Sequence, residues 1–425
     1  MAIIDVLIDV LSTASILVGF MVLVGLVLQR RKISEVLSGT LKAIIGFLIF
    51  GAGGGLAGAA LGDFQGWFSE GFGLEGVLPL SEAVTALAQE RFGTVISLIM
   101  VLGFVVNLII ARITPFKYIF LTGQHNLFLA ALLTCALKSL GLGNPATILA
   151  GAVLLGICAA VYPAIAQKWM RKVTGNDDIA IGHYCTLTYA LSGWLGSKVG
   201  KPEQSTEKLN LPGWLSIFKD YVISISVSVG IFFFIAAIAA GPTAVGETSG
   251  GMNWIIYPFI QALTFAGGVY VILTGVRMML NELVPAFVGI SEKLIPNAKP
   301  ALDCPVVFQY APVATVIGFI SAYIGGLLCM LVFALLSMPV IIPVAIPYFF
   351  IGATAGVFGN ATGGWKGAIT GGFVTGIIIA VGPALIYPIM DAIGLAGSSF
   401  PEPDFVLIGV LIYYFGKVFG ISGTV

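Results

Sequence analysis

Few side chains in this chain could bind a polar molecule inside an apolar protein, and His183 is the first of them. It follows Gly182 and precedes Tyr184 within residues 179–196, a stretch that is apolar enough to enter a membrane. An imidazole can donate and accept a hydrogen bond at once, which suits a ligand that carries several hydroxyl groups. The alternative is a packed histidine bonded to a neighbouring backbone carbonyl. The sequence leaves both interpretations open.

A second histidine and an isolated aspartate have the same potential. His125 lies in TGQHN at 122–126, where consecutive hydrogen-bonding groups, including Gln124 and Asn126, enter an apolar segment. We expect this cluster to contact a ligand. Asp303 lies between two prolines at the start of another apolar segment. Its carboxylate could accept hydrogen bonds from a substrate, or it could cap the following helix at the positive end of the helix dipole.

Other polar positions have structural explanations of similar weight. Ser81 and Glu82 follow a proline in an acidic stretch, so Glu82 is either a ligand contact or a solvated charge. Glu282 could form a structural ion pair with Arg277. Asn360 lies in GVFGNATGG, where close backbone packing explains the glycines as well as a binding site does.

These residues form no nucleophile–base arrangement and no metal-ligand spacing. With 2 histidines and no acidic cluster, hydrolytic or metal chemistry is not expected, so we predict no catalytic residue, no metal and no cofactor. The 5 cysteines lie in apolar context without metal or redox spacing. The sequence therefore predicts a binding or transport protein rather than an enzyme.

Membrane helices must position these side chains. Hydrophobic residues make up 58% of the chain, charged residues 9%, and the mean hydropathy is +1.04, so charge is too scarce to cover a soluble protein. The formal net charge of zero gives no reason to expect a nucleic-acid partner. We predict an all-α polytopic membrane protein with about eleven spans. The candidate spans are 11–29, 40–62, 94–112, 125–141, 145–165, 220–241, 253–276, 304–323, 326–346, 366–388 and 405–422.

The distribution of lysine and arginine predicts how these spans are oriented. Basic residues gather at 30–32, 168–172 and 198–219, whereas 63–90, 242–252 and 389–404 contain none. This pattern places the N-terminus outside and the C-terminus in the cytoplasm. The first segment has no basic n-region or cleavage site, which favours a retained helix over a signal peptide. We found no polar block that would suit a fused soluble domain, so we treat residues 1–425 as one membrane unit.

Some segments begin and end on the same side and are predicted to be interfacial or re-entrant. On the cytoplasmic side they are 114–124, 179–197 and 278–302, and residues 63–93 form an external excursion. As one helix, 179–196 would be about 27 Å long, marginally short for a bilayer.

Two of these segments also share an internal similarity. The spacing of Ala180-Ile181 and Tyr189-Ala190 recurs in Ala301-Leu302 and Tyr310-Ala311. We interpret this as a duplicated unit with a helix pair inserted in one copy, and chance similarity between apolar segments is the alternative.

Several segments together resemble the SgaT/UlaA-type IIC permeases of the bacterial phosphotransferase system, whose best-known member is ascorbate-specific. They are LNLPGWLSIF at 209–218, GVRMMLNELVPAFVGISEKLI at 275–295, ALDCPVVFQYAP at 301–312, GVFGNATGGWKGA at 356–368, and the TG…H and IGH motifs. The resemblance implies a homodimer with an inverted-repeat-like core domain that holds the sugar and a second domain that makes the dimer. It further implies an elevator-like motion and phosphorylation of the substrate by a separate IIB protein, which receives phosphate from IIA.

The resemblance also implies a set of substrate contacts. By position they fall on Ser81, Glu82, Gln124, His125, Asn126, Leu127, Phe128, His183, Tyr184 and Asp303. His183 and Asp303 keep the residue types of the ascorbate pattern. That pattern has Thr-Tyr in place of Ser81-Glu82, His in place of Gln124, and Gln in place of Phe128 and Tyr184. Glu82 would repel an ascorbate anion, so a neutral sugar or polyol competes with ascorbate as the expected substrate.

The expected function is therefore a IIC permease of the bacterial inner membrane that carries L-ascorbate or a related sugar inward. The alternative is a proton-coupled secondary transporter of a sugar or polyol, with Glu82 or Asp303 as the proton relay. The two differ in their product, because the permease yields a phosphorylated substrate and the carrier yields free substrate.

Overall fold

The computed structural model describes residues 14–72, 77–79, 81–208, 221–293, 295–336, 338, 340, 341, 343, 345–395 and 398–418. The LNLPGWLSIF segment at 209–218 lies outside the described residues, as does Leu294. The described part is almost entirely helical, with a few short strands. This confirms the predicted all-α class.

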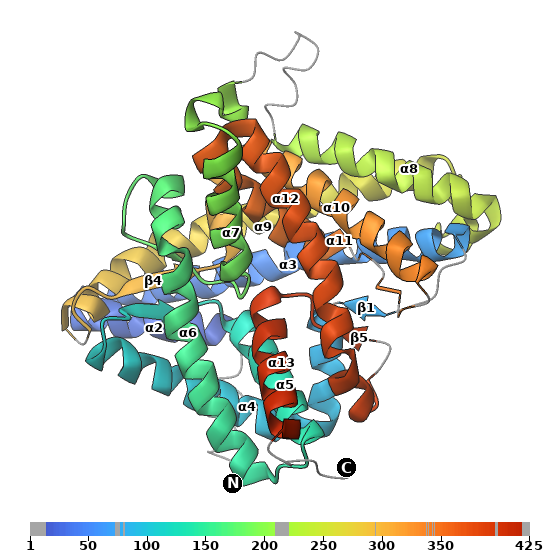
Figure 1. Ribbon diagram of the computed structural model, residues 1–425. Coiled ribbons are helices and arrows are strands. Elements are labelled where there is room, and N and C mark those ends of the chain that lie inside the picture. The colour runs from blue at the N-terminus through green and yellow to red at the C-terminus, as the bar shows by residue number, and fades with distance from the viewer. Residues whose placement is uncertain are drawn as a thin grey trace.

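One group of helices packs mainly on itself and lies across the molecule, at a steep angle to the remaining helices (Figure 1). Its members are α2 (Ala14–Leu28), α3 (Ile33–Phe72), α8 (Tyr221–Thr248) and α9 (Ile256–Lys293). The rings of Phe64 and Phe233 stack between α3 and α8 with centroids 5.2 Å apart. Lys42 Nζ lies 3.2 Å from Glu282 Oε1 and ties α3 to α9. The ion pair that we expected between Glu282 and Arg277 is thus made with Lys42, from a neighbouring helix that the sequence pattern could not place.

A second group of helices surrounds the polar residues that the sequence analysis proposed as ligand contacts, among them His125, His183 and Asp303. Its members are α4 (Ser81–Ile113), α5 (Gly123–Ser139), α6 (Asn144–Thr174), α7 (Thr186–Val199), α10 (Pro312–Leu335), α12 (Ala353–Ala392) and α13 (Pro403–Val418). Shorter pieces are η1 (Pro202–Gln204), η2 (Thr206–Lys208), η4 (Cys304–Tyr310), α11 (Ala345–Pro347) and η5 (Tyr348–Gly352). Local sequence sets their limits: α6 has a proline in its first turn and ends at Gly175, whose φ of 77° forms a left-handed cap.

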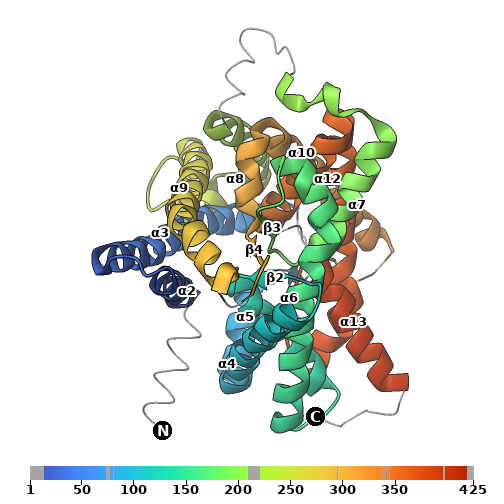
Figure 2. The same ribbon diagram turned by 90° about the vertical axis from the view of Figure 1, so that its left-hand side faces the viewer.

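Two small parallel sheets lie where segments of this group break. In one, β4 (Lys299–Leu302) lies between β2 (Tyr118–Phe120) and β3 (Ala180–Ile181). Figure 2 shows these strands at the centre of the molecule, between α9 on one side and α6 and α10 on the other. In the other sheet, β1 (Leu78–Pro79) pairs with β5 (Ser398–Ser399), and Val77 bridges to Ile341. Each strand leads within a few residues into a helix.

Four helices of the described part are long and apolar enough to cross a membrane, by length and composition. They are Arg91–Ile113, Asn144–Thr174, Pro312–Leu335 and Tyr348–Ala392. The first two coincide with the predicted spans 94–112 and 145–165. The separate spans 304–323 and 326–346 are wrong, because one helix, α10, covers 312–335. Residues 179–196, predicted to be interfacial or re-entrant, do not form one continuous helix, because β3 and a turn precede α7.

The last helix corrects the predicted orientation of the C-terminal end. A Cβ at Gly382 on α12 would meet Val406 on α13, and one at Gly409 would meet Ile386 and Ile389. The two sets of contacts follow the same direction along both helices, so α13 runs parallel to the end of α12. Residues 405–422 therefore do not form a span that carries the chain from loop 389–404 to the opposite side. The end of α13 instead lies at the same end of the molecule as Gly394.

Asn360 and its glycines have a packing role. Among the contacts of the described residues, Asn360 Oδ1 accepts hydrogen bonds from the backbone N–H of Thr206 at 2.9 Å and from its hydroxyl at 3.2 Å. Any Cβ at Gly359 or Gly363 would collide with backbone atoms of Gly367 or Gly196. This supports the packing interpretation and fixes the 202–208 turn against α12.

Candidate functional site

The candidate site lies at the carboxyl ends of β2, β4 and β3. Because these strands are parallel, the residues that follow them meet at the same edge of the sheet. Gln124 and His125 follow β2, His183 follows β3, and Asp303 follows β4. The register pairs Ala180 with Ala301 and Ile181 with Leu302. The segments that the sequence relates by internal similarity are thus neighbouring strands, aligned as in that similarity.

A glycine allows β3 and β4 to come this close. The Gly182 N–H donates to the Leu302 carbonyl at 2.6 Å, and a Cβ at this position would collide with the Ala301 carbonyl. The residue before His183 must therefore be glycine for His183 to lie beside the end of β4.

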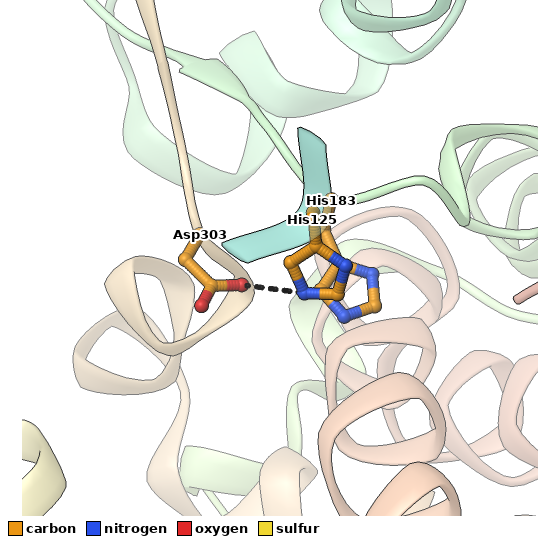
Figure 3. Close-up of side chains that lie close together, drawn as sticks. All are labelled: His125, His183 and Asp303. Atoms are coloured by element: carbon orange, nitrogen blue, oxygen red, sulfur yellow. Dashed lines mark ion pairs between the residues drawn. The ribbon is translucent and has the colours of Figure 1, made fainter. Parts of the chain in front are cut away.

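Asp303 is the central acceptor of the site. Its Oδ2 accepts a hydrogen bond from Gln124 Nε2 at 2.9 Å, and its Oδ1 accepts one from the Cys304 N–H at 2.7 Å. His125 Nε2 lies 3.7 Å from Oδ1, as Figure 3 shows. Asp303 therefore caps η4, which confirms the capping interpretation, and it also faces the residues after β2; its contact with a substrate stays a prediction.

The two histidines lie against each other. Their ring centroids are 4.1 Å apart, and both side chains are buried. His183 Nδ1 pairs with the Tyr189 hydroxyl at 3.0 Å, so its partner there is a side chain rather than a carbonyl. His125 packs edge-on against Phe128, and its Nδ1 is buried without a hydrogen-bond partner among the described residues. A polar atom left in this way is suited to a ligand or a water molecule.

Asn126 and Tyr184 bond to each other. The Tyr184 hydroxyl donates to Asn126 Oδ1 at 2.8 Å, and its fully buried ring stacks on Phe120 with centroids 4.3 Å apart. Asn126 Nδ2 in turn donates to the Phe120 carbonyl at 3.4 Å. Leu127 is partly buried and packs against the neighbouring apolar core. These residues bond to one another and pack next to the two histidines.

Ser81 lies at the end of the second sheet. Its hydroxyl donates to Glu402 Oε2 at 2.5 Å, which joins the start of α4 to the residue before α13. Glu82 is the second residue of α4, and its side chain lies outside the described part of the structure.

Asp404 connects the two sheets. Its carboxylate is fully buried and accepts hydrogen bonds from the Thr186 N–H at 2.8 Å, the Thr186 hydroxyl at 2.7 Å and the Leu187 N–H at 3.2 Å. Its own N–H donates to the Tyr184 carbonyl at 3.1 Å. Asp404 therefore caps α7 from α13 and holds β5 close to the turn that carries His183.

The sequence interpretation missed Glu402, Asp404 and Tyr189. The first two were treated as charges of an external loop, although Glu402 is 5% exposed and Asp404 is 0% exposed. One signal could have found them: PEPD at 401–404 places carboxylates between prolines before an apolar segment, as in the setting of Asp303. Tyr189 had no such signal, because only the tertiary structure places it beside His183.

His125, His183 and Asp303 are residue types that can bind a metal ion, so their spacing can be compared with that of a metal site. One ligand atom each of His125, His183 and Asp303 lie within 4.8 Å of one another. Donors that share a zinc ion at about 2.1 Å can be no more than about 4.2 Å apart. Asp303 and His183 are already bonded to Gln124 and Tyr189. The arrangement is therefore more open than a metal-ligand set and fits a hydroxylated ligand better.

Known proteins resemble this chain over much of its length. Residues 9–404 match the family model described as the PTS system sugar-specific permease component. The "Ascorbate-specific PTS system EIIC component" of Mycoplasma pneumoniae (strain ATCC 29342 / M129 / Subtype 1) is 31% identical over 373 residues, which are 76% of this chain and 56% of that protein. The chain thus spans little more than half the length of this relative. "Glucose transporter 1B/1C/1D/1F/2B" of Trypanosoma brucei brucei is 24% identical over 214 residues, 45% of this chain and 40% of that protein.

The family match includes both sheets and the residues at their carboxyl ends. It confirms the resemblance drawn from the sequence segments. This chain belongs to the sugar-specific permease (IIC) family of the phosphotransferase system.

Proposed function

We propose that this chain binds one small polyhydroxylated molecule, L-ascorbate or a related sugar, and carries it inward for phosphorylation by a separate IIB protein. The observation that carries the proposal is the convergence of Gln124, His125, His183 and Asp303 at the ends of three parallel strands, with both histidines buried. Buried polar groups of this kind, in a chain of this family, suit the recognition of a hydroxylated ligand.

Each side chain has a distinct task in this proposal. Asp303 is an acceptor for substrate hydroxyls, and Gln124 orients it through one carboxylate oxygen. Tyr189 holds the ring of His183 through Nδ1, which leaves Nε2 to face the ligand. His125 offers its unpartnered Nδ1. Donors and acceptors thus alternate around the bound molecule, as a sugar requires.

The broken helices suit the movement of this site. Strands and helix starts lie in the interior, where their free backbone groups bond to one another rather than to lipid. We propose that the group formed by α4–α7, α10, α12 and α13 moves with the substrate against the group formed by α2, α3, α8 and α9. The second group would make the homodimer.

Replacement of the ligand-facing residues tests the proposal. We expect His183→Ala and Asp303→Ala each to reduce phosphoenolpyruvate-dependent uptake by about 100-fold or more, because each removes a charge-assisted or buried hydrogen bond. Both variants should still be recovered from membranes as folded protein. The matched control is Asp178→Asn, which changes an exposed carboxylate in the loop before β3. Normal transport by both site variants would refute this site.

The chemical form of the accumulated substrate separates the proposal from proton-coupled transport. Phosphorylated product that depends on phosphoenolpyruvate and IIB supports the permease. Free substrate that accumulates uphill and is lost with the proton gradient supports the secondary carrier, with Asp303 as the partly buried carboxylate that would take the proton.

We place the protein in the bacterial inner membrane, with the basic residues near 30–32, 168–172 and 198–208 in the cytoplasm. The N-terminus would then be external. The 202–208 turn would then lie on the side where IIB would dock.

A further inference from the structure

A second polar cluster lies at the carboxyl ends of β1 and β5. Ser81 and Glu402 are bonded to each other there, and both are at most 5% exposed. Thr85 lies one turn after Ser81 on α4, and Ser399 lies in β5, three residues before Glu402. The arrangement repeats that of the first sheet, in which polar residues follow parallel strands that lead into helices.

This second cluster contains hydroxyl groups without partners. Thr85 Oγ1 and Ser399 Oγ are shielded from solvent and have no hydrogen bond among the described residues. The first cluster has two such atoms, Thr122 Oγ1 and His125 Nδ1. Four of the six atoms of this kind in the described part therefore lie near the carboxyl ends of the two sheets. Buried polar groups without a partner are unfavourable, so their concentration here indicates a ligand that supplies the missing bonds.

The two clusters belong to one region. Asp404, two residues after Glu402, donates its N–H to the carbonyl of Tyr184, the residue after His183. Its carboxylate bonds to Thr186. The hydrogen bond from the Asp404 N–H joins α13 to the turn after β3. Glu402 lies two residues from its donor, and His183 lies one residue from its acceptor.

The charges of this region oppose an anionic ligand. Helix starts normally attract anions, but here the protein's own carboxylates occupy them: Asp303 bonds to the N–H at the start of η4, and Asp404 bonds to those of α7. Glu402 directly precedes α13. The basic residues nearest in sequence to Asp303 and Ser81 are bonded elsewhere, because Lys299 pairs with Asp177 and Arg91 donates to the Ile393 carbonyl.

We infer that Glu402, with Ser81, Thr85 and Ser399, forms the second half of the substrate site and selects a neutral sugar or polyol over an anion such as ascorbate. This inference rests on the proposed function and names the substrate class of that site. A carboxylate accepts hydrogen bonds from two adjacent hydroxyls of a neutral ligand, whereas it repels a second negative charge. The orphaned hydroxyls of Thr85 and Ser399 would bond to the same molecule.

Calorimetric binding to the purified full chain tests the inference. The probes are xylitol, D-sorbitol and D-xylose as neutral compounds and L-ascorbate as the anion. We expect at least one neutral probe to bind about tenfold or more tightly than ascorbate. Glu402→Gln should raise the dissociation constant of that neutral probe by about tenfold, which corresponds to the loss of one charge-assisted hydrogen bond. The dissociation constant of ascorbate should stay the same or fall. Glu35→Gln, at an exposed position on α3, is the matched control and should change neither affinity.

A second variant separates binding from folding. Ser399→Ala removes a hydroxyl that has no partner among the described residues, so the thermal stability of the protein should not fall. We expect the affinity for the neutral probe to fall by about threefold or more. Tighter binding of ascorbate than of every neutral probe, or no binding of any neutral probe, would overturn the inference.

The experiments distinguish a failure of this inference from a failure of the proposed function. If ascorbate is taken up and phosphorylated, the permease function stands and the substrate class is wrong. If a neutral probe binds through Glu402 but accumulates unphosphorylated, the substrate class stands and the phosphotransferase role is wrong.

Discussion

At the scale of single residues, Tyr184 and Asn126 illustrate how a side chain can lie at a site and still bond to the protein. Both were predicted to contact substrate, and their mutual hydrogen bond of 2.8 Å lies behind the two histidines. His125 differs from them, because its Nδ1 is buried without a hydrogen-bond partner among the described residues. The distinction decides which substitutions should affect stability and which should affect binding.

Tyr184→Phe tests this distinction. The change leaves Asn126 Oδ1 buried without its donor, so we expect the free energy of unfolding in detergent to fall by about 1–3 kcal/mol. The dissociation constant of the substrate should change by less than about threefold, because the aromatic stack on Phe120 is retained. Tyr414→Phe, at a position 47% exposed, is the control for both measurements. A large loss of affinity at unchanged stability would make Tyr184 a direct substrate contact.

At the scale of elements, the pairing of β3 with β4 depends on the absence of a side chain at Gly182. We expect Gly182→Ala to separate the strands and to lower stability by about 1–3 kcal/mol, the usual effect of overpacking. Uptake should fall more than stability, because His183 would move away from Asp303. Gly246→Ala in α8 is the matched control, since a Cβ there meets nothing within 4 Å. Equal effects of the two variants on uptake would contradict this role of the pairing.

The amino end of β4 is attached to α6 by an exposed ionic cluster. Asp177 accepts hydrogen bonds from Arg171 Nε at 2.7 Å and Gln167 Nε2 at 2.8 Å, and it pairs with Lys299. Partial burial alone would raise the pKa of Asp177, but the bonds from Lys299, Arg171 and Gln167 outweigh it and lower the pKa to about 2 from the ordinary 3.8. The folded-state pKa is the lower one, so this stabilisation is present above about pH 4 and is lost as the pH falls toward 2.

Asp177→Asn should therefore remove a pH-dependent part of stability between about pH 4 and pH 2. The side chain is 43% exposed, so solvent screening limits the effect to less than about 1 kcal/mol. Acid unfolding curves followed by intrinsic fluorescence would measure it. Asp178→Asn, next along the chain, provides the comparison, and identical acid curves for the two variants would rule out the cluster as the source.

At the scale of the whole molecule, the parallel arrangement of α12 and α13 determines on which side the chain emerges. A Cβ at Gly416 would meet Leu140, so the end of α13 also lies beside the end of α5 (Figure 1). The 202–208 turn lies at the opposite end of this part of α12, because Gly364 packs against Lys201 and Gln204. The end of α13 and residue 201 should therefore face opposite sides of the membrane.

Cysteine labelling tests this topology. We expect a membrane-impermeant maleimide to label Val418→Cys in intact spheroplasts and to label Lys201→Cys only after the membrane is opened. Both positions are exposed, and native Cys135, Cys158, Cys185 and Cys304 are buried, so the unmodified protein is the background control. Labelling of both positions from the same side would restore the topology drawn from the charge pattern.

The sequence singled out residues that the structure brings together, but it predicted the connections around them less well. His183 and Asp303 were identified from residue type and from their place beside glycine and proline, because polar groups at depth are rare and such breaks free the backbone to bond elsewhere. The predicted limits of the spans 304–323 and 326–346 were wrong, because apolar strands, turns and helices have similar compositions. Glu402 and Asp404 were missed, because a charge pattern cannot distinguish a solvated loop from a re-entrant segment.

The sequence by itself determined the helical class of the protein, its family and most residues of the candidate site, because composition and local breaks are local properties. Only the tertiary structure decided that β3 and β4 are neighbours, that Tyr189 positions His183, and that α13 returns to the side from which it came. The β3–β4 pairing joins segments more than 100 residues apart, the Tyr189 contact depends on the turn that separates it from His183, and the return of α13 depends on the direction of a helix. None of these leaves a periodic signal in the chain. The position of Glu402 beside Ser81, 321 residues away, is of the same kind.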